Sequence, residues 1–424
     1  ATGYLGTSPS SSPENRHRKS IEGERPGRGR YALDTGSTID MALCREVFKN
    51  TAKLAYILGY DTKPSEQSFL TELDKTNQRL LPYQISKRGT IQEYSKDFHE
   101  THSPHRHASH LLGIWPLSSI SRHETPTLFD AGKLSIKLRG SGGGHPDKAA
   151  MYARVGQGDK AWVAKHSFKT TIDANFGILG RWAPLFAGFP ELFLQSDNTY
   201  IELLPALPSV IPDGKIAGLK ARGKHILSIE WKNGKLSKAV IHSQNGVTPR
   251  VMYKGRFLDI ENDPRITLVK GTVKLDKVIA DAAAMLAENY SVATKEKLKI
   301  AITRARKLPK KPTKIQLKIA VNAIDKAIAS LSLQKPQFLG KKQFYIPLNK
   351  ESEISIKAKV ISRPNQSLVY YSNDLPAYAK LNKFTGKITL NPSSGQATQD
   401  QFTVTVNDGV SENTQTYTIN LRGK

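Results

Sequence analysis

Apolar residues in the first half of the chain recur with the period of amphipathic helices. A helix is predicted from a capping-box-like start at Ser37 and Asp40 to a stop at Gly59. Its apolar residues share one face: Leu43, Val47, Leu54 and Leu58. The same period predicts further helices over residues 65–81, 127–138, 145–155 and 158–170. We therefore expect an all-α region over residues 1–196.

In the same region, one stretch is expected to be a loop and two more are expected to be helices. Residues 16–30 are basic and contain glycine, so a loop is expected. A helix around Leu111 and Ile114 is expected to anchor the polar stretch before it. Residues 178–194 are long and apolar, which predicts a buried helix interrupted at Pro190.

The segment Thr171–Gly177, of sequence Thr-Ile-Asp-Ala-Asn-Phe-Gly, immediately precedes that apolar helix. It places the acid Asp173 beside the amide of Asn175, in a loop where burial would raise the pKa of the carboxyl and neighbouring amides would orient it. The alternative is that Asp173 only caps the helix, since aspartate is a favoured N-cap residue.

After residue 196 the pattern changes to short alternating strands. Residues 226–231 and 236–241 alternate on either side of Asn233-Gly234, a signal for a hairpin with a type I′ turn. A small antiparallel β domain is therefore predicted over residues 197–271. Helical periodicity returns in three pieces over residues 272–333, whose exposed faces are rich in lysine and arginine. Alternation over residues 340–424 predicts an immunoglobulin-like β-sandwich.

Composition narrows the class of protein. The 424 residues contain no apolar run of about eighteen, so no membrane span is expected. The net charge of +26 first suggests a nucleic-acid partner, but the basic residues are not interleaved with stacking aromatics in a known module. We favour either a protein that works near a polyanionic surface such as a cell wall, or one from a proteome that is strongly basic throughout. The single cysteine, Cys44, excludes an internal disulfide.

The densest polar cluster lies in residues 93–116 and allows two interpretations. His105, His107 and His110 have spacings that could bind a metal, but no cysteine assists and no His-Glu-x-x-His pattern is present. The favoured interpretation is a polar wall that hydrogen-bonds a hydroxyl-rich ligand, with arginine and histidine as donors. The glycine run after Arg139 is not a phosphate loop, because it lacks Gly-Lys-Ser/Thr.

A second candidate acid lies near the start of the chain. Residues 8–15 are predicted to form a stiff, non-helical loop, because Pro9 and Pro13 fix their own backbone angles. Glu14 is held on this stiff segment, as a positioned catalytic carboxyl should be. The alternative is a solvated glutamate in a surface loop.

These motifs stand together in a recognisable order: Ser8-Pro-Ser-Ser-Ser-Pro-Glu-Asn15, His105-Arg-His-Ala-Ser-His-Leu111, Ile172-Asp-Ala-Asn-Phe-Gly177, Leu203-Leu-Pro-Ala-Leu-Pro208, Gly218-Leu-Lys-Ala-Arg-Gly223 and Ile229-Glu-Trp-Lys-Asn-Gly234. In that order and context they resemble glycoside hydrolase family 95, whose members are mostly inverting 1,2-α-L-fucosidases. The resemblance covers about residues 1–250. It implies that residues 1–196 are the C-terminal part of an (α/α)6 catalytic barrel, followed by the family's small β domain. Residues 272–333 resemble the FIVAR helical modules of Gram-positive cell-surface proteins, and residues 340–424 resemble immunoglobulin-like or cadherin-like modules.

The resemblance also implies roles for individual residues. Glu14 is similar to the general acid, and Asp173 to the base that activates water. Arg106 and His107 are similar to part of the fucose-binding wall, and the amide of Asn175 would help to keep Asp173 charged. Glu14 would need partial desolvation to raise its pKa. The two carboxyl groups are expected about 6.5–9.5 Å apart, the range for inversion. Family members carry an Asn-x-Asn pair upstream, which has no counterpart here, so we expect the sequence to begin inside a longer protein.

The expected substrate is terminal α-1,2-linked L-fucose on an oligosaccharide or glycoprotein, and no cofactor or metal is expected. The alternatives are an α-L-galactosidase of the same family, whose sugar differs by one hydroxyl, and a non-catalytic glycan-binding surface protein. Anionic cell-wall polymers are a further expected partner, whereas nucleic acid is not. From the modules alone, an extracellular or cell-surface location on a Gram-positive bacterium is expected.

Overall fold

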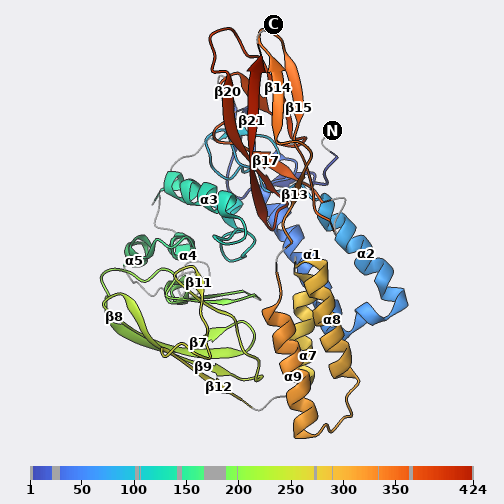
Figure 1. Ribbon diagram of the computed structural model, residues 1–424. Helices are drawn as coiled ribbons and strands as arrows, with labels where there is room; N and C mark the ends of the chain where they lie inside the picture. Colours follow the sequence, from blue (N-terminus) through green and yellow to red (C-terminus); the bar gives the residue numbers. More distant parts are fainter. Residues whose placement is uncertain are drawn as a thin grey trace.

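The computed structural model describes residues 3–21, 29–100, 105, 107–140, 146–166, 188–197, 199–271, 275–288, 290–332, 334–361 and 366–422. Four regions follow one another along the chain: a helical N-terminal region, a two-sheet β region, a three-helix unit and an immunoglobulin-like β region. Figure 1 shows the three-helix unit beside the long N-terminal helix, and the immunoglobulin-like region at the other end of the molecule. Among the described residues, no helix is both long and apolar enough to cross a bilayer.

The long N-terminal helix α1, Thr38–Leu58, is built as its local sequence predicts. The Ser37 side chain accepts from the backbone N–H of Asp40, and Gly59 ends the helix in the left-handed conformation at φ 74°. Helix α2, Pro64–Arg79, follows with its proline in the first turn. Both predicted helices are confirmed.

The apolar face of α1 does not lie in the core. Exposed fractions are 44% for Leu43, 58% for Val47, 58% for Leu54 and 61% for Leu58. The opposite face packs against α7, Leu275–Ala284, and the short 3-10 helix η4, Met285–Ala287. Within the described residues, the neighbouring helices instead cover the face that carries Lys49 and Lys53.

The other described helices of this region are α3, Pro126–Arg139, α4, Pro146–Arg154, and α5, Gly158–His166, and they confirm the predicted segments up to residue 166. The region is not all-α. Strand β1, Ser10–Ser11, pairs with β3, Leu33–Asp34, and β2, His17–Ile21, pairs with β4, Phe98–Glu100. The expected loop at residues 16–30 thus contains a strand, since a distant segment supplies its hydrogen-bonding partner.

One expected helix is shorter than predicted. The stretch around Leu111 forms only one 3-10 turn, η2, Ser109–Leu111, followed by turns. Of the apolar segment 178–194, residues 178–187 lie outside the described residues, so the helix expected there stays a prediction. At the expected interruption, Pro190–Leu192 form a 3-10 turn, η3.

The β region contains two four-stranded sheets. One has the order β11-β10-β6-β5 and the other β12-β9-β8-β7. The strands of the first sheet are β5, Leu194–Ser196, β6, Ile201–Leu203, β10, Val251–Tyr253, and β11, Arg256–Phe257. Those of the second are β7, Gly214–Ala221, β8, His225–Lys232, β9, Lys235–Ser243, and β12, Ile266–Lys270.

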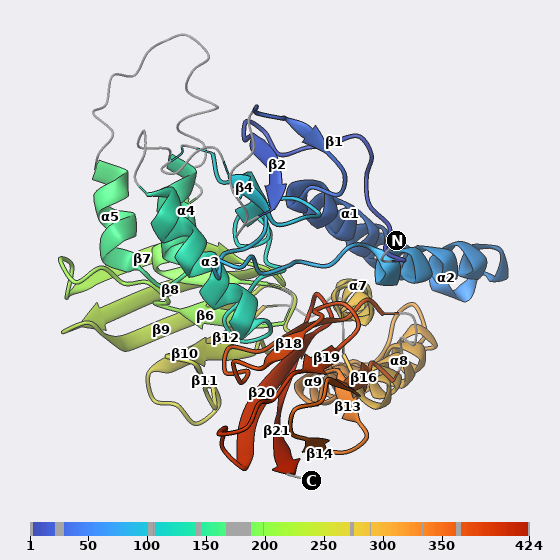
Figure 2. The ribbon, with the colours of Figure 1, turned by 90° about the horizontal axis from the view of Figure 1, so that it is seen from above.

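The predicted hairpin is confirmed, with Asn233 and Gly234 at φ 51° and 68° between β8 and β9. The prediction of a purely antiparallel domain is wrong, because β10 pairs with β6 and β12 pairs with β9 in parallel. Each parallel pair is joined by a long connection rather than a hairpin, which is what parallel neighbours require. Seen from above, this region lies beside α3, α4 and α5 (Figure 2).

The three-helix unit consists of α7, α8, Val292–Arg306, and α9, Lys314–Ala329. A full capping box at Thr313 and Gln316 starts α9. The helices enclose a separate apolar core that includes Val278, Leu298 and Ile324, and Tyr56 of α1 packs against it. The three predicted helices are confirmed. The unit that they form packs against α1.

The described residues of the immunoglobulin-like region form nine strands: β13, Gln337–Leu339, β14, Gln343–Pro347, β15, Ser352–Ser355, β16, Lys357–Lys359, β17, Val369–Tyr371, β18, Ala379–Leu381, β19, Lys387–Leu390, β20, Gln399–Asn407, and β21, Glu412–Arg422. A four-stranded sheet, β14-β21-β20-β17, and a three-stranded sheet, β15-β19-β18, enclose one apolar core. The predicted β-sandwich is confirmed.

This β-sandwich is attached to the helical region by specific hydrogen bonds. The carboxylate of Glu412 accepts from the backbone N–H groups of Thr127 and Leu128 at the start of α3, at 2.9 and 3.3 Å. The Tyr371 hydroxyl donates to the carbonyl of Tyr83 at 3.0 Å, and Lys383 Nζ donates to Gln92 Oε1 at 3.0 Å. The module is therefore part of one packed body with the helical region.

Candidate active site

The loop of residues 8–15 is fixed at its near end by α1. Ser10 Oγ donates to Asp40 Oδ2 at 2.6 Å and lies 2.7 Å from Ser37 Oγ, the cap of α1. Ser10 is 3% exposed. The loop is thus held to the start of a helix, and its stiffness has a tertiary cause as well as the prolines.

The far end of the loop is fixed by a buried ion pair between Glu93 and Arg139. Arg139 Nη2 donates to Glu93 Oε2 at 2.5 Å, and both side chains are at most 4% exposed. Ser12 Oγ donates to the other carboxylate oxygen, Glu93 Oε1, at 2.6 Å. Arg139 Nη1 donates to Asn15 Oδ1 at 3.2 Å. One ion pair therefore binds the residues two before and one after Glu14.

The charge of Glu93 is maintained by its neighbours. Burial alone would raise the pKa of this carboxyl, but the charges of His110 and Arg139 and hydrogen bonds from His110 and Ser12 outweigh it, so the pKa lies well below its usual range. His110 Nδ1 lies 3.5 Å from Glu93 Oε1 in a site where both side chains are almost fully buried. Glu93 is a permanent anion at neutral pH.

Glu14 lies at the tip of this loop and faces His107. Its side chain is 63% exposed, and Glu14 Oε2 is 3.3 Å from His107 Nε2. The loop buries Ser12 and Asn15 and leaves Pro13 and Glu14 between them exposed, so the partial desolvation of Glu14 stays a prediction. The structure does bring together two of the predicted site residues, Glu14 and His107.

The other predicted site residues, Arg106, Asp173 and Asn175, lie outside the described residues. The separation of the Glu14 and Asp173 carboxyl groups therefore stays a prediction, and so does the alternative role of Asp173 as a helix cap.

The three histidines once considered as metal ligands do not share one site. His110 turns inward to Glu93, whereas the rings of His105 and His107 lie 5.4 Å apart, centroid to centroid. Within the described part of the chain, no group of three or more His, Cys, Asp or Glu side chains could hold a metal ion. The favoured interpretation of this stretch, a polar wall, fits the position of His107 beside Glu14.

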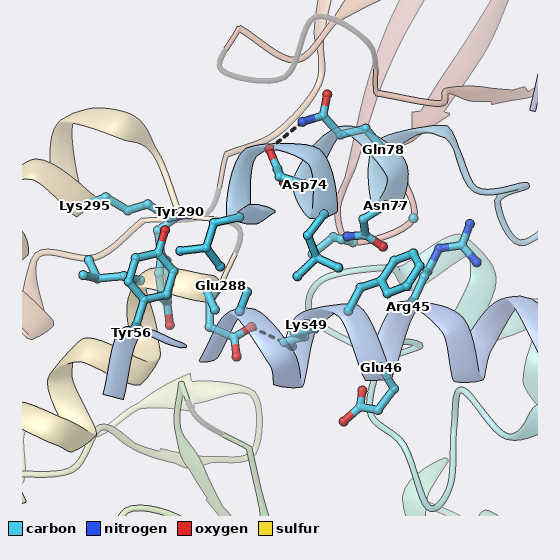
Figure 3. A pocket seen from close by; sticks show the side chains of 18 of the residues that line it. Arg45, Glu46, Lys49, Tyr56, Asp74, Asn77, Gln78, Glu288, Tyr290 and Lys295 are labelled. Atoms are coloured by element: carbon cyan, nitrogen blue, oxygen red, sulfur yellow. Dashed lines mark hydrogen bonds and ion pairs between the residues drawn. The ribbon is translucent and has the colours of Figure 1, made fainter. Parts of the chain in front are cut away.

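A cavity of about 560 Å³ lies elsewhere, between α1, α2 and the start of α8 (Figure 3). Neither Glu14 nor His107, the two predicted site residues that the structure describes, lines it. On its wall, Lys49 of α1 binds Glu288 at 2.7 Å, and Gln78 Nε2 donates to Asp74 Oδ2 at 2.6 Å on the facing helix (Figure 3). Lys53, also of α1, binds the other oxygen of Glu288 at 3.3 Å.

One carboxyl of this cavity has an unusual protonation state. Burial raises the pKa of Glu124 to about 8, and the carboxylates of Asp197 and Glu288 contribute in the same direction, against Lys49. Burial likewise raises the pKa of the Tyr290 phenol, which lines the same cavity. Glu124 is therefore largely protonated at neutral pH.

From the sequence, Glu93 belonged to a polar cluster without a role of its own, His110 was a candidate metal ligand, and Arg139 only preceded a glycine run. The available signal was the position of Glu93 between Ile91 and Tyr94, both at most 3% exposed in the structure. An acid in a buried apolar segment requires a cation, and that requirement predicts an ion pair without identifying its partner.

Comparison with protein-family models divides the chain into three matched segments. Residues 1–185 match the "Glycosyl hydrolase family 95 catalytic domain", residues 195–307 the "Glycoside hydrolase family 95, C-terminal domain", and residues 342–422 the "Putative Ig domain". The second match runs through α7 and α8 and so crosses the boundary predicted at residue 272. The FIVAR identity of residues 272–333 stays a prediction.

Curated relatives are distant. Alpha-L-fucosidase 2 of Arabidopsis thaliana is 31% identical over 282 residues, which cover 60% of this chain and 31% of that protein. "Probable alpha-fucosidase A" of Aspergillus oryzae is 26% identical over 277 residues, covering 56% of this chain and 36% of that protein. The chain thus spans about a third of the length of these relatives.

Among solved structures, human protocadherin-24 EC1-2 is 17% identical, with a TM-score of 0.18, over 20% of this chain and 43% of that chain. A TM-score this low does not define a shared fold.

Proposed function

We propose that this chain is part of an inverting 1,2-α-L-fucosidase. It carries glycoside hydrolase family 95 catalytic and C-terminal domains followed by an Ig-like domain. Three findings support the proposal: the family matches over residues 1–185 and 195–307, the distant similarity to two α-fucosidases, and the geometry of the Glu14 loop. The observation that carries it is that Glu14 is presented outward beside His107 on a loop whose flanking residues are buried.

In this proposal Glu14 is the general acid. Its proton passes to the glycosidic oxygen as the bond from that oxygen to the sugar C1 breaks, so the rest of the glycan leaves as a neutral alcohol. Asp173 takes a proton from water, and the resulting hydroxide attacks C1 from the opposite face. The product is β-L-fucose, and the two carboxyl groups need about 6.5–9.5 Å between them to admit the water.

The remaining predicted site residues would bind and orient. His107 lies 3.3 Å from Glu14 and is placed to contact both the acid and a sugar hydroxyl. Arg106 adds a charged donor on the same wall, and Asn175 orients Asp173. The helices α1 to α5 would then be a portion of an (α/α)6 barrel. The substrate class is terminal α-1,2-linked L-fucose on an oligosaccharide or glycoprotein.

We further propose that the protein works at a Gram-positive cell surface, with anionic wall polymers as neighbours. The support is the exposed basic face of the FIVAR-like three-helix unit, which includes Lys297, Lys299 and Arg304. Exposed cations of this kind attract polyanions in a manner that salt screens. Loss of binding to isolated cell walls as salt rises would support this part of the proposal.

The test is an assay of the protein, in the longest form its gene encodes, on 2′-fucosyllactose. Fucose release by wild type, with losses of at least about 100-fold in Glu14→Gln and in Asp173→Asn, is expected from the usual size of general acid–base contributions. Release of L-galactose from the corresponding L-galactoside in preference to fucose would favour the α-L-galactosidase alternative. Glycan binding without turnover would contradict the enzymatic proposal and favour a glycan-binding surface protein.

A further inference from the structure

The residues on both sides of Glu14 converge on one buried pair of side chains. Ser12 is fully buried and donates to Glu93, and Asn15, 3% exposed, accepts from Arg139. The Tyr94 hydroxyl donates to the carbonyl of Asn15 at 3.1 Å, and Ser109 Oγ donates to the carbonyl of Pro13. Glu14 and Pro13 are thus exposed, whereas Ser12 and Asn15 on either side of them are buried and hydrogen-bonded to Glu93 and Arg139.

We infer that Glu93 and Arg139 are positioning residues that hold the Glu14 carboxyl at the glycosidic oxygen, and this inference rests on the proposed function of Glu14. Neither residue reaches the substrate side of the loop, since both are almost fully buried. They act through Ser12 and Asn15, whose backbone determines where the Glu14 side chain starts.

The pair is itself held from several directions. Arg139 is the last residue of α3, and Ser135 of the same helix accepts from the backbone N–H of Ile91 at 2.9 Å, which fixes α3 against the Glu93 segment. Lys148 Nζ donates to the carbonyls of Gly140 and His105, each at 2.7 Å, and so ties the end of α3 to the segment that carries His107. The end of α3 therefore supports both the loop that carries Glu14 and the segment that carries His107.

The geometry requires arginine rather than any cation. The guanidinium uses one terminal nitrogen for Glu93 and the other for Asn15. A lysine ammonium keeps the charge opposite Glu93 but is a single point and does not reproduce the planar fork. Arg139→Lys should therefore loosen Asn15 while leaving the buried carboxylate with a cation.

The test exploits the different needs of different leaving groups. A sugar alcohol is a poor leaving group and needs the proton from Glu14, whereas fluoride leaves without one. In the longest form of the protein, Arg139→Lys is expected to lower kcat on 2′-fucosyllactose by about 100-fold, since a displacement of about 1 Å has that effect. On α-L-fucosyl fluoride the loss should stay within about tenfold, and KM should change less than kcat on both substrates.

A matched control exists in the same region. Arg154 binds Glu191 through Nε and Nη2 at 2.6 and 2.9 Å, with side chains 15% and 14% exposed. It touches neither the loop of residues 8–15 nor Arg139. Arg154→Lys is expected to lower thermal stability, but to change kcat on 2′-fucosyllactose and on α-L-fucosyl fluoride by the same factor. Asn15→Ala removes only the contact to Arg139 and should reproduce the separation at smaller size if Arg139→Lys does not fold.

The outcomes are distinguishable. Glu14→Gln must itself spare the fluoride relative to 2′-fucosyllactose, and if it does not, the proposed role of Glu14 fails whatever Arg139 does. If Glu14→Gln separates the substrates but Arg139→Lys and Asn15→Ala lower both equally, or neither, the positioning inference is overturned and the pair is only structural. Separation in all three variants, and not in Arg154→Lys, supports it.

Discussion

The Glu14 loop and the junction between α1 and the three-helix unit both take carboxylates out of water, with opposite results. Beneath the loop, Glu93 meets Arg139 and His110, and its pKa falls. At the junction, Glu124 lies near the carboxylates of Asp197 and Glu288, and its pKa rises to about 8. Burial acts in the same direction on both groups, so the neighbouring charges decide the difference.

The two regions differ in which buried carboxylates have a lysine or arginine bound to them. Although the chain has a net charge of +26, Lys49 and Lys53 at the junction are both bound to Glu288. Glu124 is left with acidic neighbours and holds a proton. Local geometry, not overall charge, sets the ionisation of a buried group.

The largest effect is expected from breaking the compensated pair. Glu93→Ala leaves the Arg139 guanidinium buried without a carboxylate, which should lower the free energy of unfolding by about 3–5 kcal/mol. Urea unfolding followed by tryptophan fluorescence measures the loss. The double variant Glu93→Leu with Arg139→Met removes both charges and should lose less than the single variant. If Glu93→Ala were as stable as wild type, the ion pair with Arg139 would not distinguish this region from the junction.

A smaller effect, of opposite sign, is expected at the junction. The folded pKa of Glu124 is raised from 4.5 to about 8, so between these pH values the folded chain holds a proton that the unfolded chain has released. Its stability contribution is therefore present below about pH 4.5 and is lost as pH rises through 8. Glu124→Gln should be more stable than wild type by on the order of 2 kcal/mol at pH 8.

The measurement for Glu124 is the difference in unfolding free energy between variant and wild type as a function of pH. That difference should shrink to near zero at pH 4, where both chains carry a neutral group. A difference that does not depend on pH would mean that Glu124 is ionised in the folded chain, and the contrast with Glu93 would disappear.

The smallest effect sharpens the comparison with a third carboxylate. Glu412 is 5% exposed and is compensated by donors rather than by a cation: the backbone N–H groups at the start of α3 and the amide of Asn407 at 2.7 Å. Glu412→Gln should cost about 1 kcal/mol, the usual worth of a helix N-terminal acceptor. Hydrogen exchange at Thr127 and Leu128 should quicken, and unchanged exchange there would show that the contact is not formed in solution.

Local sequence predicted the parts of the fold that local chemistry determines. The cap at Ser37, the stop at Gly59 and the turn at Asn233-Gly234 each depend on neighbours a few residues away, and each was predicted correctly. The exposed face of α1 and the parallel pairing of β9 with β12 were not, because both depend on which distant elements pack together.

The candidate site divides in the same way. Glu14 and His107 could be predicted as residues, from motifs that resemble a family. Their support could not, since Arg139 reaches Glu93 across 46 residues and Glu412 reaches Thr127 across 285. A sequence identifies the reactive side chains more readily than the side chains that position them, because the positioning residues come from segments that meet only in the folded protein.

The measurement that tests the account most directly is the anomeric form of the sugar first released from 2′-fucosyllactose. Proton NMR in the first minutes of reaction separates the two anomers before they interconvert. Proton donation by Glu14 and attack by water on the opposite face predict β-L-fucose from the α-linked substrate. Initial release of α-L-fucose, or no release of fucose from the protein in its longest form, would contradict the account.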